Sequence, residues 1–178
     1  MSEKKLTSEN FETIFATNLL GGFELTQILL PALAAGGSDD DPARVINVSS
    51  GGMYAKKLKV EDMENDPATF DGVDLYANTK RGQVFLTELW AAKYSGVVPV
   101  QFFSMHPGWA ITPGVETSLP GFFSKMQGMM RTAEQGADTI NWLAVADKTK
   151  LKSGEFYFDR LVAQFVFSLP TVLQFHLY

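Results

Sequence analysis

Cysteine is absent from this sequence of 178 residues. A chain without thiols forms no disulfides and offers no thiolate ligands to a metal, and such a composition fits a reducing compartment. Histidine is scarce as well, because the chain holds only His106 and His176. Two imidazoles and no thiols are a poor ligand set for zinc, so we expect no metal site.

Basic residues are also few, with 15 Lys and Arg against 20 Asp and Glu and a net charge of −5. Binding to a nucleic-acid backbone needs a basic surface, so we expect no nucleic-acid partner. The first ten residues lack the apolar core of a signal peptide, and residues 161–178 are too short and too polar to predict a membrane span. These absences favour a cytoplasmic location without membrane attachment.

The composition is otherwise that of one globular domain, with 46% hydrophobic and 20% charged residues. Segments with apolar residues at helical spacing alternate with short apolar, β-branched runs. This pattern predicts helices over 8–34, 75–95 and 132–146, and strands over 44–49, 97–105 and 155–158. Long helices between buried strands indicate parallel crossover connections, and therefore an α/β fold with helices on both faces of a sheet.

Tyr76 and Lys80 are four residues apart in a predicted helix, and residues at that spacing lie on one helix face. An ammonium beside a phenol favours the ionised phenol, so a tyrosine with an ordinary pKa of about 10 becomes a usable acid or base near neutral pH. The pair alone also fits a solvated helix face. Ser50 and His106-Pro107-Gly108 favour the functional interpretation, because each follows a predicted strand, where parallel sheets bind ligands.

Four ordered motifs carry a more specific signal. They are Phe15-Ala16-Thr17-Asn18-Leu19-Leu20-Gly21, Val48-Ser49-Ser50-Gly51-Gly52-Met53, Tyr76-Ala77-Asn78-Thr79-Lys80-Arg81 and Met105-His106-Pro107-Gly108-Trp109. Together they resemble the short-chain dehydrogenase/reductase family, from about Leu6 to Arg160. The resemblance implies that residues 1–160 are the C-terminal portion of a Rossmann-type, doubly wound parallel sheet. Residues 161–178 depart from the polar tail expected of this family and form an atypical apolar tail.

The resemblance implies NAD(P)-dependent oxidoreduction of a carbonyl or alcohol, with four catalytic residues. Tyr76 would give a proton to the developing alkoxide, and Lys80 would support the ionised phenol. Ser50 would hydrogen-bond the substrate oxygen, with Ser49 as the adjacent competitor. Asn18 would kink the first helix and hold a water in a proton relay.

The same resemblance implies a set of residues that bind NAD or NADP. Tyr76 and Lys80 would hold the hydroxyls of the nicotinamide ribose, and Thr112 would bond the carboxamide. The turn at Pro107 and Gly108 would let the backbone approach the nicotinamide ring. The residue that distinguishes NAD from NADP is not among those that match the family.

One family feature is missing from the sequence. No glycine-rich turn follows a strand, so the helix N-terminus that binds pyrophosphate is absent. We therefore expect that the first βαβ half of the fold is missing, and that the chain is a truncated, alternatively spliced or misassembled product. Weak or absent cofactor binding, impaired activity, poor solubility and an unpaired edge at strand 44–49 would follow.

Two alternatives remain open at this point. The chain could be a non-catalytic interaction fragment that docks through helices 8–34 and 75–95, as a homodimer or with a full-length homologue. An apolar stripe could be either ordinary core or a lid over a lipophilic substrate, and its members are Phe122, Phe123, Met126, Met129 and Met130.

Overall fold

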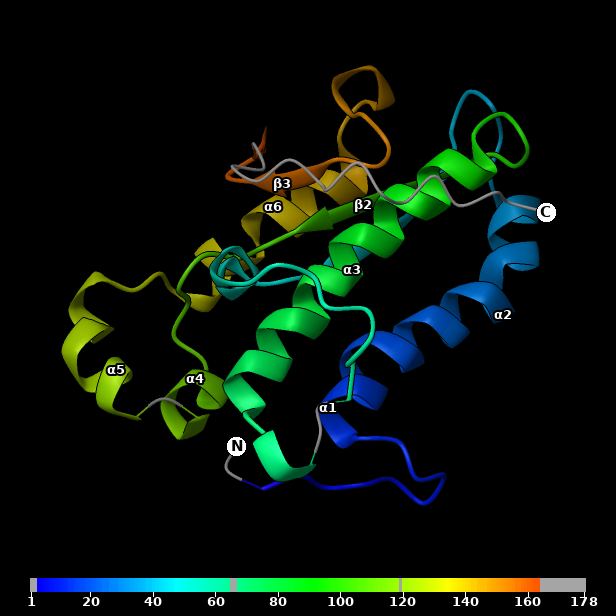
Figure 1. Ribbon diagram of the computed structural model, residues 1–178. Coiled ribbons are helices and arrows are strands. Elements are labelled where there is room, and N and C mark those ends of the chain that lie inside the picture. Colours follow the sequence, from blue (N-terminus) through cyan, green and yellow to red (C-terminus); the bar gives the residue numbers. More distant parts are fainter. Residues whose placement is uncertain (1–2, 65–66, 119, 164–178) are drawn as a thin grey trace.

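The computed structural model describes residues 3–64, 67–118 and 120–163 (Figure 1). The strands are β1 (Ala43–Val48), β2 (Val100–Met105), β3 (Phe156–Phe158) and β4 (Leu161–Val162). The helices are α1 (Thr13–Phe15), α2 (Gly21–Gly36), α3 (Gly72–Tyr94), α4 (Pro113–Ser118), α5 (Pro120–Met126) and α6 (Ala133–Val145). A π-helical segment spans Ala16–Leu20, and short 3₁₀ turns span Gly51–Ala55, Pro67–Thr69, Gln127–Met129 and Lys148–Lys150.

The strands form one sheet in the order β1-β2-β3-β4. β1 pairs in parallel with β2 over six residue pairs, and β2 pairs in parallel with β3. The predicted parallel α/β arrangement is therefore confirmed for three strands. β4 was not predicted and pairs with β3 in the antiparallel direction, so the first residues of the apolar tail extend the sheet. The rest of the tail, residues 164–178, lies outside the described residues.

Helices cover both faces of this sheet, as the crossover pattern predicts (Figure 1). Adjacent side chains of a strand point to opposite faces, and two neighbouring phenylalanines of β2 show both layers. Phe102 packs with Trp90 of α3 and with apolar residues of α2, whereas Phe103 packs with Leu143 of α6. On the α6 side, the Arg44 guanidinium donates hydrogen bonds of 2.7 Å to two carbonyls at the end of that helix.

The first helix starts later than predicted. Thr13 is its first residue, because the Glu12 carboxylate accepts a hydrogen bond from the Phe15 N–H and caps the helix. Ser8, the first residue of the predicted helix, instead donates to its neighbour Glu9 in a turn that ends at Asn10, where φ is 68°. The helix then runs through the π-helical segment into α2, which places the predicted irregularity around Asn18.

The continuous helix Thr13–Gly36 is long and apolar enough to span a membrane, by length and composition alone. No membrane span was predicted from the sequence. Core helices of soluble proteins pass the same test, and here Phe23, Leu30 and Leu33 of α2 pack on the cluster around Phe102. The outer face differs, because Leu25 and Ile28 are 58% and 71% exposed.

Candidate active site at the carboxyl ends of two strands

The carboxyl ends of β1 and β2 lie side by side. Val48 is paired with Met105, and the Ser49 N–H donates to the Met105 carbonyl at 2.7 Å. The turns that follow also meet, since a Cβ added at Gly51 would lie 3.4 Å from the His106 ring. The structure thus brings the predicted serine segment against the predicted His-Pro-Gly turn.

The two adjacent serines have different environments. Ser49 is buried, and its hydroxyl donates to the Lys80 carbonyl at 2.7 Å, so this side chain fixes β1 to α3. Ser50 is half-buried, and its hydroxyl oxygen accepts from the Gly52 N–H at 3.2 Å at the start of a 3₁₀ turn. Ser50 is therefore the member of the pair with a hydroxyl that can reach a ligand.

Lys80 reaches from α3 to the end of β1. Its ammonium donates to the Val48 carbonyl at 2.9 Å and lies 5.7 Å from the centre of the Tyr76 ring. Burial of the ammonium lowers the pKa of Lys80 below its usual value. The spacing of four residues has therefore placed phenol and ammonium on one face of α3, beside the strand end that leads to Ser50.

Asn18 joins this group through both its side chain and its backbone. Its amide donates to the Thr79 hydroxyl at 3.2 Å, and its carbonyl accepts from the Gln83 amide at 2.6 Å. The other end of the Gln83 amide accepts from the Lys80 ammonium at 3.3 Å. Gln83 was not predicted, although a residue three positions after Lys80 on a helix is a neighbour that spacing alone can identify.

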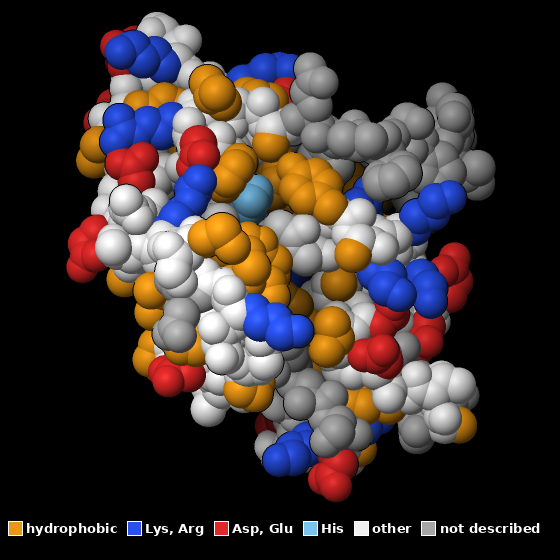
Figure 2. Space-filling model, turned by 90° about the vertical axis from the view of Figure 1, so that its left-hand side faces the viewer, with side chains coloured by type: hydrophobic (Ala, Val, Ile, Leu, Met, Phe, Trp, Pro, Cys, Tyr) orange, Lys and Arg blue, Asp and Glu red, His pale blue; other side chains and the backbone are white. Residues whose placement is uncertain are grey.

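The second turn is built around Gly108, where φ is +75°. The Gly108 N–H donates to Nδ1 of His106 at 3.2 Å, which requires that this nitrogen is unprotonated. The imidazole is 8% exposed and is stacked between Phe156 and Phe158, with ring centres 5.5 and 4.0 Å away. In Figure 2 the pale-blue imidazole lies among hydrophobic side chains. Burial, with a smaller contribution from Arg131, lowers the pKa of His106 to about 4.

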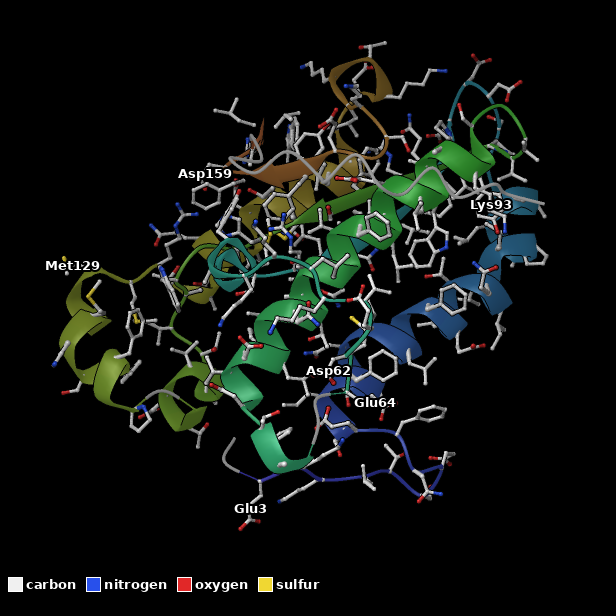
Figure 3. The ribbon with its side chains drawn as sticks, viewed as in Figure 1. Glu3, Asp62, Glu64, Lys93, Met129 and Asp159 are labelled. Atoms are coloured by element: carbon white, nitrogen blue, oxygen red, sulfur yellow. The ribbon has the colours of Figure 1, made fainter. Side chains whose placement is uncertain are left out.

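Arg131 holds this turn from outside and was also missed from the sequence. Its guanidinium pairs with both carboxylate oxygens of Asp159, at 2.5 and 2.7 Å, and lies 4.8 Å from the centre of the Phe158 ring. Its backbone exchanges hydrogen bonds with Trp109 and Ile111. Asp159 is labelled just beyond β3 in Figure 3. The pair ties the end of the loop that follows the turn to the end of β3.

That loop carries Thr112 and the apolar stripe. The Thr112 hydroxyl accepts from the Val115 N–H at 3.2 Å, so it caps α4. The Thr112 side chain is also exposed. Trp109 is 48% exposed and contacts the Phe122 ring, with centres 4.4 Å apart. Met129 is 74% exposed at the outer end of the segment (Figure 3). The other four members of the predicted stripe, Phe122, Phe123, Met126 and Met130, are partly buried.

Substitution of Gly108 by alanine should destabilise the turn. The positive φ disfavours any side chain, and an added Cβ would lie 2.9 Å from Nε of Arg131. We expect a loss of about 2 kcal/mol of unfolding free energy, measured by urea denaturation. Gly121→Ala is the matched control, because a Cβ added at this helical position would have no atom within 4 Å. Equal stability of Gly108→Ala and Gly121→Ala would contradict the close approach.

No family model matches the sequence, whereas individual relatives do. Dehydrogenase/reductase SDR family member 12 of Bos taurus is 45% identical over 161 residues, which are 90% of this chain and 49% of the relative. The protein of that name from Homo sapiens is 44% identical over the same share of each chain. Retinol dehydrogenase 12 of Homo sapiens is 30% identical, over 86% of this chain and 47% of the relative.

Solved structures share the fold at lower identity. A 3-ketoacyl-(acyl-carrier-protein) reductase from Brucella melitensis, complexed with NADH, superimposes with a TM-score of 0.62 at 18% identity. The match covers 86% of this chain and 59% of that chain. A short-chain dehydrogenase from Salmonella enterica gives a TM-score of 0.58 at 21% identity, over 87% and 56%. The chain therefore belongs to the short-chain dehydrogenase/reductase family, and it spans about half the length of the curated relatives that it matches.

Proposed function

We propose that the chain carries the proton-transfer part of an NAD(P)-dependent oxidoreductase site that acts on a lipophilic carbonyl or alcohol. The observation that carries this proposal is the position of Lys80. Its ammonium donates to the carbonyl of Val48, two residues before Ser50, at 2.9 Å and lies 5.7 Å from the centre of the Tyr76 ring. A proton donor, a cation that stabilises its ionised form and a hydroxyl donor thus share one strand end.

In the direction of reduction, the Tyr76 hydroxyl gives its proton to the carbonyl oxygen of the substrate as the carbonyl carbon accepts a hydride. The Ser50 hydroxyl donates a hydrogen bond to the same oxygen as negative charge develops there. The Lys80 ammonium stabilises the phenolate that remains on Tyr76. A reduced nicotinamide supplies the hydride when it is bound. Oxidation of an alcohol reverses each transfer.

The residues present fit the nicotinamide end of such a cofactor. Gly108 allows the positive φ of the turn at the carboxyl end of β2, which is where parallel sheets bind ligands. The Lys80 ammonium has three N–H donors, of which two are used by Val48 and Gln83 in the described part of the chain. The third suits a ribose hydroxyl, and Thr112 stands in the loop that follows the turn.

The pyrophosphate end has no corresponding site among the described residues. Within residues 3–64, 67–118 and 120–163, no strand leads into a glycine-rich helix N-terminus. Phosphate contacts at such a site supply charge-assisted hydrogen bonds that the nicotinamide end cannot replace. We therefore expect weak binding of either nucleotide by the chain alone, and impaired turnover.

The lipophilic substrate is inferred from the loop that follows the Pro107-Gly108 turn. Trp109, Ile111 and Met129 are exposed on this loop, and a row of large apolar side chains beside a polar reaction centre suits an apolar ligand. The unbranched side chain of methionine also adapts to ligands of different shape. The loop would then act as a lid over the substrate.

Titration with NADPH and NADH tests the proposed cofactor site. Calorimetry of the purified chain should show saturable binding weaker than a Kd of about 100 μM, which corresponds to about −5.5 kcal/mol. Lys80→Met should weaken this binding further, whereas Lys93→Met, on an exposed part of the same helix, should not. A folded sample without any binding, or with binding that is indifferent to Lys80, would contradict the assignment of the nicotinamide site.

A second function, an interaction fragment that docks through its long helices, is favoured by one observation. Leu25, Ile28 and Leu29 expose a row of apolar side chains on the outer face of α2. We propose that this face pairs with the same helices of a second copy or of a full-length homologue. Sedimentation should then show a dimer that Ile28→Asp dissociates, whereas Glu24→Gln at an exposed position of α2 should leave it intact. A monomer at all concentrations that still binds nucleotide would favour the enzyme alone.

A further inference from the structure

One side chain of the site has two polar partners from different elements. Nε2 of Gln83 donates to the Asn18 carbonyl at 2.6 Å, and Oε1 accepts from the Lys80 ammonium at 3.3 Å. The first partner lies in the π-helical segment and the second lies on α3 itself. The primary amide therefore links the irregular turn of the first helix to the ammonium beside Tyr76.

The orientation of this amide is determined by the chemistry of its partners. A carbonyl oxygen only accepts hydrogen bonds and an ammonium only donates them. The amide must therefore turn its NH₂ group to Asn18 and its oxygen to Lys80. The reverse orientation would place the amide oxygen against the Asn18 carbonyl and the NH₂ group against the Lys80 ammonium. A single orientation makes the link specific, because neither a carboxylate nor an apolar side chain can bond both partners.

Lys80 needs such a link, because a lysine side chain has four rotatable bonds and its ammonium is free to move unless it is held. The Val48 carbonyl supplies one contact and Gln83 supplies the other. The Asn18 carbonyl in turn is anchored, since its residue also donates to the Thr79 hydroxyl one position before Lys80. The hydrogen bonds of Gln83 and Asn18 thus connect the Lys80 ammonium to Thr79, the residue next to Lys80 on α3.

We propose that Gln83 is a positioning residue, which holds the Lys80 ammonium in place by anchoring it to the backbone of Asn18. The effect of this bridge on catalysis rests on the proposed oxidoreductase function, whereas the bridge itself does not. A relay water at the Asn18 carbonyl, as the family resemblance implies, would share that oxygen with the Gln83 amide.

Nuclear magnetic resonance of protein labelled with [ε-¹³C]lysine tests the bridge without any turnover. A held lysine shows two distinct ε-proton signals, and a mobile one shows a single averaged signal. We expect two signals for Lys80, assigned by their loss in Lys80→Arg, and their merger in Gln83→Met. Gln27→Met is the matched control, because Gln27 also links α2 to α3, through the Tyr94 hydroxyl at 3.4 Å. It should leave the Lys80 signals unchanged.

A second variant keeps the test decisive if Gln83→Met does not fold. Gln83→Glu retains an oxygen that accepts from Lys80 and loses the donor to Asn18, so the anchor is broken and the two Lys80 signals should move towards each other. Unchanged Lys80 signals in Gln83→Glu, or in a folded Gln83→Met, would overturn the positioning role.

Turnover is measured separately with NADPH and a lipophilic aldehyde. We expect Gln83→Met to lower kcat/KM about tenfold, as the loss of a hydrogen bond to a charged group predicts, and Gln27→Met to leave it unchanged. If the Lys80 signals merge in Gln83→Met and the wild-type chain shows no turnover, the bridge is supported and the proposed function is rejected. Turnover that Gln83→Met does not change would overturn the catalytic effect of the bridge and leave the proposed function standing.

Discussion

Replacement of Tyr76 by phenylalanine should lower the rate of carbonyl reduction by about 10²–10⁴-fold, the usual contribution of a general acid. The change removes the hydroxyl that is expected to give its proton to the substrate oxygen, and it keeps the ring near Lys80. The half-buried position of Tyr76 predicts an unchanged fold. The measurement is the steady-state oxidation of NADPH or NADH with a lipophilic aldehyde.

Tyr94→Phe is the matched control for this prediction. Tyr94 lies on the same helix, and its hydroxyl donates to Gln27 rather than to the site. The rate should therefore remain close to that of the wild-type chain. Similar rates for Tyr76→Phe and the wild type would show that another group supplies the proton. Similar losses in both variants would indicate that a hydroxyl on α3 matters for folding rather than for catalysis.

Acidification from pH 6.5 to pH 4 should remove about 3 kcal/mol of stability through His106 alone. The imidazole has a pKa of about 4 in the folded chain and an ordinary value of 6.5 when unfolded. Between these values the unfolded state binds a proton that the folded state does not, so the free energy of unfolding falls as the pH falls. The stabilisation is present above pH 6.5 and is lost as the pH approaches 4.

Urea denaturation at intervals between pH 4 and pH 7 measures this effect. His106→Phe removes the titrating group and keeps an aromatic ring between Phe156 and Phe158, so its stability should change less with pH than that of the wild-type chain. The variant will also lose the hydrogen bond from the Gly108 N–H, which lowers its stability at every pH. The comparison therefore concerns the slope against pH. An unchanged slope in His106→Phe would assign the acid sensitivity to carboxylates, such as Asp159 beside Arg131.

Most of the secondary structure could be predicted from periodicity and local signals. The helix predicted over 75–95 forms as Gly72–Tyr94, where the Asp71 carboxylate caps two N–H groups, and the helix at 132–146 begins with a Thr132–Gln135 capping box. The start of the first helix was predicted wrongly, because the cap that forms depends on Glu12. Its backbone N–H bonds the carboxylate of Glu64, which is distant in sequence. Local propensity does not contain such a contact.

The candidate site was likewise predictable only where local signals determine it. Tyr76 and Lys80 were identified from their helical spacing, and the strand ends that carry Ser50 and Gly108 were identified from topology. Ser50 was preferred to Ser49 because of the family resemblance, since the order of two adjacent residues at a strand end does not show which side chain points inward. The hydroxyl of Ser49 is used by the Lys80 carbonyl, which only the packing of α3 against β1 decides.

The sequence by itself determined the parallel α/β arrangement and the residue types at its strand ends, because periodicity and topology are local or nearly local properties of a chain. The tertiary structure alone decided which side chains complete the site. Gln83 bonds a carbonyl 65 residues earlier, and Arg131 bonds a carboxylate 28 residues later. Such pairs depend on how α3 crosses the first helix and on where β3 ends, which follows from side-chain packing across the whole domain.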